Sequence, residues 1–298
     1  MADEKIFEVA PGENYEDDRS KITIFFQVLG RKFWKLITIN LMFMLFNLPA
    51  MIISLVFSTF LLNVLMPAGL ATENELLSNL LVLGLPLTLC LMVVPMITVG
   101  PAQAGMTYLL RCFAYEMPTF TWTDFKDKMK ENFKQGLLVS VINLFAIAFL
   151  IYDLYLYTQL NAQSSAILSI ANGLLIVVFV LFLMMSLYIY PMMVSYQLKT
   201  KHLYKNAILF AFAKFLPNLG VLLLCFIIIL APMLIGVLVG APIIIGIGYV
   251  IYVILGYSLP GYIINFVINP IIDKYLKPVE KEGSDSAVVE LTEDTESP

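Results

Sequence analysis

The sequence predicts an all-α protein, a polytopic membrane bundle of six transmembrane helices with amphipathic cytoplasmic helices. Composition is the first observation, because 60% of the 298 residues are hydrophobic and only 13% are charged. An ordinary soluble domain is about 45–50% apolar and about 25% charged. The other two observations are six apolar runs of membrane-spanning length and the placement of the basic residues between them. A soluble globular protein is excluded.

Each apolar run can be tested by its length, since a hydrocarbon core about 30 Å thick needs about 20 residues of helix. The predicted spans are residues 36–66, 76–99, 136–157, 166–196, 219–239 and 243–268. One helix over the last two runs would be far longer than a bilayer is thick, so the chain must fold back between them. We expect that turn at Gly240, Ala241 and Pro242.

The basic residues predict the orientation of these spans. All 18 Lys and Arg lie before span one, between spans two and three, between spans four and five, or after span six. The positive-inside rule therefore places both termini and the two long connections in the cytoplasm. Around the membrane domain, residues 20–278, we expect an acidic N-terminal tail, residues 1–19, and an acidic disordered tail, residues 279–298.

The connection between spans two and three contains an amphipathic segment. Trp122, Phe125, Met129 and Phe133 recur at helical spacing, while acids and lysines occupy the other faces. This pattern is typical of a helix that lies at the lipid headgroups.

Two interpretations of this segment stay open. Thr121 and Asp124 would begin the helix as a capping box. The helix could be a connection packed on its own spans, or it could dock a partner. The candidate docking residues are Trp122, Asp124, Phe125 and Lys126.

A threefold repeat is a further hypothesis. A polar or basic segment ends in a phenylalanine and leads into a span three times, as RKFWKL at 31–36, ENFKQGL at 131–137 and AKFLPNLG at 213–220. Because two spans follow each segment, the pattern would give three parallel helix-plus-hairpin units around an axis normal to the membrane.

The polar side chains inside the spans are amides and hydroxyls, and no ionisable residue lies near a span centre. The principal amides are Asn40, Asn47, Asn143 and Asn172. Such groups commonly form hydrogen bonds between membrane helices. The alternative is that they line a polar pathway for a solute.

Catalytic, metal and cofactor sites are not predicted. The three cysteines have no partner at metal or redox spacing, and the single histidine, His202, lies in a basic stretch. No set of nucleophile, base and partners lies near a membrane boundary, so we expect no enzymatic activity. The basic residues follow membrane topology, which does not favour nucleic-acid binding.

The segment 98–136 contains a distinctive set of residues: Gly100, Pro101, Ala102, Tyr108, Arg111, Trp122, Asp124, Phe125, Lys126, Asn132, Phe133 and Lys134. With these residues the segment resembles the YesL-like family of bacterial integral membrane proteins, which is known as a domain of unknown function. Segments 36–49 and 203–211 are similar too, so the resemblance covers most of the membrane region but not the acidic tails.

The resemblance implies a multi-pass protein of the bacterial cytoplasmic membrane, with no established activity, often encoded beside carbohydrate uptake transporters. Gly100 and Pro101 would end span two, because proline blocks continuation of a helix. Arg111 would then contact lipid phosphate at the cytoplasmic boundary.

Two functions follow as hypotheses. The first is a non-enzymatic accessory protein of carbohydrate uptake, whose partner is a subunit of a carbohydrate ABC transporter. The alternative is a facilitator or carrier for a small uncharged solute, such as a saccharide, lined by the four asparagines. In both cases the lipid bilayer surrounds the protein. Assembly as a homo-oligomer is a further alternative.

Overall fold

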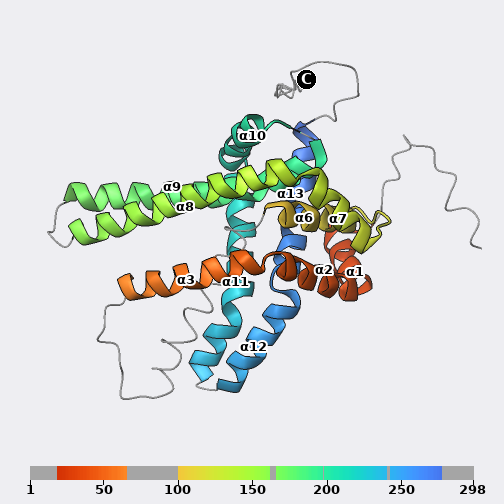
Figure 1. The fold of residues 1–298 in the computed structure, drawn as a ribbon, viewed down its shortest axis with the longest axis horizontal. Helices are drawn as coiled ribbons and strands as arrows, with labels where there is room; N and C mark the ends of the chain where they lie inside the picture. Colours follow the sequence, from red (N-terminus) through yellow and green to blue (C-terminus); the bar gives the residue numbers. More distant parts are fainter. Residues whose placement is uncertain (1–18, 66–99, 162–165, 197, 240–241, 277–298) are drawn as a thin grey trace, which may run out of the picture.

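The computed structural model describes residues 19–65, 100–161, 166–196, 198–239 and 242–276 (Figure 1). Within these ranges the chain forms eleven α-helices and no strand, so the predicted all-α class is confirmed. The helices are α1 (Lys21–Arg31), α2 (Phe33–Phe46), α3 (Leu48–Leu65), α6 (Gly100–Ala114), α7 (Thr121–Glu131), α8 (Phe133–Asn161), α9 (Ala166–Tyr196), α10 (Thr200–Ala213), α11 (Phe215–Val239), α12 (Pro242–Leu255) and α13 (Ser258–Tyr275).

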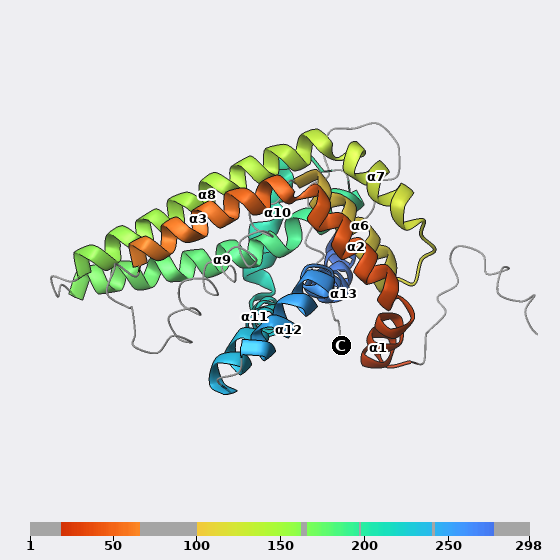
Figure 2. The same ribbon diagram turned by 60° about the horizontal axis from the view of Figure 1, so that its bottom comes forward.

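In the described part of the chain, two helices are long and apolar enough to cross a membrane alone. These stretches are Phe133–Leu156 in α8 and Leu168–Tyr196 in α9. They coincide with the predicted spans 136–157 and 166–196. In both views α8 and α9 lie side by side as one extended arm (Figures 1 and 2).

Three more candidate spans are helix pairs with a sharp bend. The bend is 71° between α2 and α3, 95° between α10 and α11, and 51° between α12 and α13. The described residues therefore contain two candidate spans, or up to five if each bent pair counts as one. The predicted number of six is not confirmed, and the predicted span 76–99 and the turn residues Gly240 and Ala241 lie outside the described residues.

Each of these bends has a proline near the start of its second helix. Pro49, Pro217 and Pro260 occupy the second or third position of α3, α11 and α13. Proline has no N–H for the carbonyl four residues earlier and its ring crowds that carbonyl, but it is tolerated in a first turn. One helix therefore ends and a new helix begins at an angle to it.

The phenylalanine segments of the proposed repeat adopt similar local structures. α1, α7 and α10 are each followed, after one intervening residue, by a helix that begins at Phe33, Phe133 or Phe215. The threefold arrangement of these units about an axis stays a prediction.

Helix α6 lies at the centre of the fold. It packs against α2, α7, α8, α9 and α13. Two groups of helices leave this centre in different directions, with α3, α8 and α9 extending to the left and α11 and α12 downward in Figure 1. The elements that meet at α6 therefore position any site between the two groups.

A pair of glycines lets α6 cross α8 closely. A Cβ on Gly100 would lie 1.9 Å from the carbonyl oxygen of Gly136, and one on Gly136 would lie 2.8 Å from the carbonyl carbon of Gly100. The Gly100 N–H donates to Ser140 Oγ at 2.6 Å. Gly100 and Pro101 thus begin α6, and the predicted end of span two lies among the undescribed residues before them.

Large apolar side chains are exposed along the arms. Ile52 of α3, Phe145 and Phe149 of α8, Ile227 of α11 and Ile247 of α12 are each more than half exposed. Monomeric soluble proteins rarely expose apolar surface on this scale. Such surface is typical of helices that face lipid.

Candidate functional site

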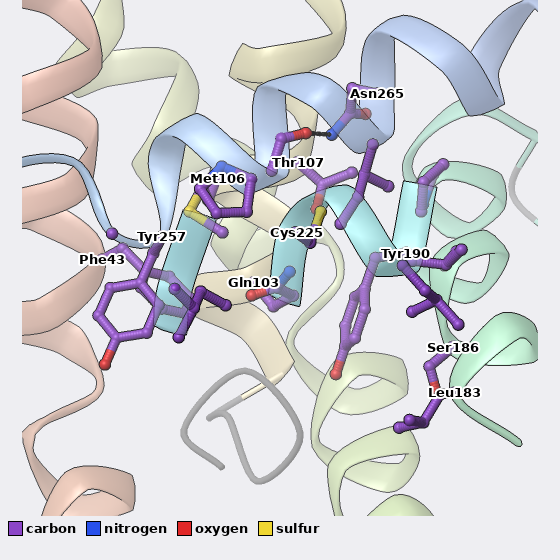
Figure 3. A pocket seen from close by; sticks show the side chains of 18 of the residues that line it. Phe43, Gln103, Met106, Thr107, Leu183, Ser186, Tyr190, Cys225, Tyr257 and Asn265 are labelled. Atoms are coloured by element: carbon purple, nitrogen blue, oxygen red, sulfur yellow. Dashed lines mark hydrogen bonds between the residues drawn. The ribbon is translucent and has the colours of Figure 1, made fainter. Parts of the chain in front are cut away.

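Helices from both groups surround a cavity of about 170 Å³ (Figure 3). The residues labelled around it are Phe43, Gln103, Met106, Thr107, Leu183, Ser186, Tyr190, Cys225, Tyr257 and Asn265. They belong to α2, α6, α9, α11 and α13 and to the break before α13. The central position of α6 and the bends of its neighbours create this space.

The wall of the cavity is neutral and mostly apolar. None of the described residues that line it is charged. Two of its amides are already engaged, because Asn143 Oδ1 accepts from the Tyr204 hydroxyl at 2.9 Å, and Asn265 Nδ2 donates to the Gly261 carbonyl at 2.8 Å. By contrast, Gln103 Oε1 is buried and has no hydrogen-bond partner in the described part of the chain.

Helix-breaking residues contribute to the wall. Pro191 lies inside α9 and, like Leu187 one turn earlier, lines the cavity. Pro191 has no N–H to donate to the Leu187 carbonyl, so this carbonyl lacks its helical donor. Gly256 and Pro260 line the cavity at the break between α12 and α13.

A polar cluster joins three of the cavity helices beyond the cavity. The hydroxyls of Tyr115, just after α6, and Tyr196, at the end of α9, donate to the carboxylate of Asp273 in α13. Arg111 Nη2 of α6 lies 3.5 Å from each oxygen of the same carboxylate. Burial, followed by the hydrogen bond to Asp273, raises the pKa of Tyr115, which keeps its hydroxyl protonated as a donor.

This cluster shows where the predicted lipid-contact residue lies. Arg111 pairs with Asp273 and its guanidinium lies 5.3 Å from the centre of the Tyr115 ring. Its Nε is buried without a hydrogen-bond partner among the described residues. Contact of Arg111 with lipid phosphate stays a prediction.

A second charged cluster attaches the start of the described chain to the end of α6. Glu116 has a positive φ of 55°, and its carboxylate accepts from Arg19 Nη2 at 2.9 Å and from Arg31 Nη2. The hydrogen bond from Arg19 is the main cause that lowers the pKa of Glu116, partly opposed by burial. The carboxylate is therefore charged at neutral pH.

Asn40, one of the four predicted asparagines, connects α2 to the break between α12 and α13. Its Oδ1 accepts from the N–H groups of Tyr257 and Ser258, each at 2.8 Å. Its Nδ2 donates to the Val253 carbonyl at 2.7 Å. Asn40 thus pairs backbone groups that the end of one helix and the start of the next leave open.

The other three asparagines are not brought together. Asn143 lines the cavity, whereas Asn47 Nδ2 donates to the Phe43 carbonyl at the α2–α3 bend. Asn172 lies near the start of α9, and its Oδ1 is buried without a hydrogen-bond partner among the described residues. Of the predicted polar pathway, the cavity includes only Asn143.

The docking candidates on α7 divide between the surface and the interior. Trp122 is 50% exposed, and Lys126 Nζ lies 4.6 Å from the centre of its ring. Phe125 is fully buried and stacks on Phe46 at 5.6 Å between ring centres. Phe125 therefore belongs to the packing of α7 on α6 and α2 rather than to its exposed surface. The docking role of the four residues stays a prediction.

The predicted capping box of α7 is also corrected. The N-cap is Phe120, and Asp124 Oδ2 accepts from the Phe120 N–H at 2.8 Å. Asp124 thus accepts from the backbone N–H of the N-cap residue, as expected, but this residue is Phe120 and not Thr121. Thr121 is the first residue of the helix.

Gln103 and Asp273 were not predicted as site residues. Gln103 is the polar residue in an otherwise small and apolar run, GPAQAG, and Asp273 is an acid at the end of the last apolar run. Both signals are present in the sequence. Their meaning depends on contacts between helices far apart in the chain. In the described ranges, no group of three or more His, Cys, Asp or Glu side chains could hold a metal ion.

The described apolar helices, some of them long enough to cross a membrane, have the character of a helical membrane protein. A family model described as "Protein of unknown function, DUF624" matches residues 36–154. This region, less than half of the chain, includes α6 and therefore one wall of the cavity. No curated protein and no solved structure gives a significant match.

Proposed function

We propose that the protein is a non-enzymatic facilitator or carrier that binds a small uncharged solute in the cavity around α6. The observation that carries this proposal is a cavity, neutral in its described lining, that α6 forms together with helices of the candidate membrane spans. A charged solute would lose its hydration without gaining an opposite charge there. Ligand sites in membrane carriers commonly lie where helices are broken, as α12 and α13 are here.

The proposal includes a membrane arrangement. The chain is a YesL-like protein that crosses the bacterial cytoplasmic membrane six times, with both termini in the cytoplasm and three helix-plus-hairpin units. The distribution of all 18 basic residues supports this orientation. The phenylalanine that begins α2, α8 and α11 supports the repeat.

Solute flux into liposomes tests the proposal. Purified protein is reconstituted, and the entry of a panel of neutral solutes, from phenol to glucose, is compared with that of empty liposomes. We expect Leu222→Trp to block flux, because Leu222 lines the cavity. The matched control is Leu223→Trp, since Leu223 is 53% exposed on the same helix. Equal rates with and without protein for every solute would overturn the proposal.

A second function is supported by the exposed part of α7. In this proposal the protein is an accessory to carbohydrate uptake that binds an ABC transporter subunit through Trp122 and Lys126. The support is the half-exposed Trp122 ring held beside a lysine ammonium, because exposed aromatic residues are enriched at protein interfaces.

Crosslinking in native membranes followed by mass spectrometry tests this second function. We expect a transporter subunit with the wild type and its loss with Trp122→Ala. The control is Trp34→Ala, because Trp34 is 78% exposed on α2. If both variants retain the subunit equally, α7 is not the docking surface.

A further inference from the structure

We infer that the cavity around α6 selects a small amphiphile, an apolar ring or short chain that carries one hydroxyl or N–H group, rather than a saccharide. This inference rests on the proposed function, because it assumes that the cavity is the solute site. It adds the chemical class of the solute and the residue that recognises it, Gln103.

The size of the cavity limits the ligand. An apolar cavity of about 150 Å³ in a protein interior holds one benzene molecule. The volume of about 170 Å³ here therefore fits about six to ten non-hydrogen atoms. A monosaccharide exceeds that number, and a disaccharide exceeds it about twofold.

The composition of the wall excludes a ligand rich in hydroxyl groups. Each hydroxyl buried without a partner loses its hydrogen bonds to water. The free energy of this loss is larger than the favourable free energy of its contacts with an apolar wall. The amides of Asn143 and Asn265 are engaged with Tyr204 and Gly261, and Ser186 Oγ donates to the Phe182 carbonyl. The other polar side chains of the described wall are Gln103, Thr107, Tyr190 and Tyr257, which are fewer than the hydroxyl groups of a hexose.

The same wall contains hydrogen-bond acceptors for one donor group of a ligand. Gln103 Oε1 is buried and unpaired among the described residues, and Gln103 lies among the labelled lining side chains in Figure 3. The Leu187 carbonyl lacks its helical donor because residue 191 is proline. A ligand with a hydroxyl or N–H group would satisfy an acceptor that the fold leaves open.

Protection of Cys225 from alkylation measures binding directly. Cys225 lines the cavity, and Cys90→Ser with Cys112→Ala makes it the sole cysteine. Purified protein is treated with N-ethylmaleimide in the presence of 4-fluorophenol, fluorobenzene or glucose. We expect 4-fluorophenol to protect Cys225 at about fivefold lower concentration than fluorobenzene, the effect of one neutral hydrogen bond, and glucose not to protect it.

Gln103→Leu is the decisive variant because it keeps the side chain's approximate size and removes the acceptor. The preference for 4-fluorophenol over fluorobenzene should disappear in Gln103→Leu. It should persist in Asn172→Leu, which removes a buried amide that does not line the cavity. Thermal unfolding of both variants confirms that they are folded.

The outcomes separate this inference from the proposed function. Equal protection by 4-fluorophenol and fluorobenzene, as expected if the cavity holds a lipid chain, overturns the amphiphile class. Protection by glucose overturns it too, but supports an uncharged solute. Flux of neutral solutes into liposomes without protection of Cys225 by any probe also overturns the inference and leaves the carrier function standing.

Discussion

A single buried amide, Asn40, pairs three backbone groups of α12, α13 and the break between them. We predict that Asn40→Leu lowers the free energy of unfolding by about 2–3 kcal/mol, because two N–H groups and one carbonyl lose their partner. The measurement is thermal or denaturant unfolding of the purified protein in detergent.

Asn172→Leu provides the control for Asn40. Its Oδ1 is buried without a hydrogen-bond partner in the described part of the chain, so removal of this amide should change stability by less than about 0.5 kcal/mol or increase it. Equal losses in the two variants would show that the bonds of Asn40 are not the cause.

We predict that Glu116 makes the stability of the folded protein depend on pH. Its pKa is lowered in the folded protein, mainly by the hydrogen bond from Arg19. The charged carboxylate therefore contributes stability at neutral pH, and this contribution is lost as the pH falls below the usual glutamate pKa toward the lowered value.

Glu116→Gln tests that dependence. The variant should be less stable than the wild type at pH 7, and the difference should shrink as the pH falls below 4.5, the usual glutamate pKa. Unfolding at a series of pH values from 7 to below 4.5 measures this. Glu131→Gln is the control, because its ion pair with Lys128 joins residues of the same surface helix. A difference that does not vary with pH would contradict the role of the Glu116 charge.

The sequence predicts which polar residues are buried in the spans, but it does not predict the different contacts that each of them makes. Asn40, Asn47 and Ser54 recur every seven residues, and all three are buried, as expected of one inward face. The chain bends by 71° just after Asn47, which separates the surroundings of Asn40 from those of Ser54. Spacing along an uninterrupted helix cannot anticipate that change of direction.

At the scale of elements, the crossing of α6 and α8 depends on the absence of two side chains. We predict that Gly136→Ala lowers the free energy of unfolding by about 1–3 kcal/mol, because its Cβ would press on the Gly100 backbone. Gly173→Ala is the control: nothing lies within 4 Å of its added Cβ. This variant should be neutral or slightly more stable. Parallel thermal unfolding checks both, and equal stability would contradict the close crossing.

Comparison of the helices with the apolar runs shows that hydropathy predicts straight spans but not bends. The straight spans in α8 and α9 agree with the apolar runs 136–157 and 166–196, because length and composition suffice for a helix that packs along one direction. The runs 36–66 and 243–268 contain bends that hydropathy does not record. Pro49 and Pro260 mark those bends in the sequence, yet the bend angle depends on the helices packed around them.

At the scale of the whole molecule, orientation is the main prediction. In a protein without its three native cysteines, Lys128→Cys should react with an impermeant maleimide only from the cytoplasmic side, and Asp153→Cys only from the outside. The reason is that α7 contains Lys126, Lys128 and Lys130, whereas the connection beyond Asp153 contains no basic residue. Labelling is compared between intact cells and inverted vesicles, and labelling of both cysteines from one side would contradict the arrangement.

The cavity could not be predicted from the sequence. Its wall combines α2, α6, α8, α9, α11 and α13, and no pattern within one of these segments specifies how they meet. A glutamine among small residues was visible in the sequence, but its role as an open acceptor exists only once the six helices are assembled.

The bonds of Asn40 also bear on the order of biogenesis. Its partners Val253, Tyr257 and Ser258 follow it by 213, 217 and 218 residues. At a synthesis rate of about 5–20 residues per second, the ribosome reaches them about 10–40 seconds after it has made Asn40. Until then α2 must wait with an amide that lacks its final partners. Maturation of α2 is therefore completed only after the end of α12 and the start of α13 have been translated.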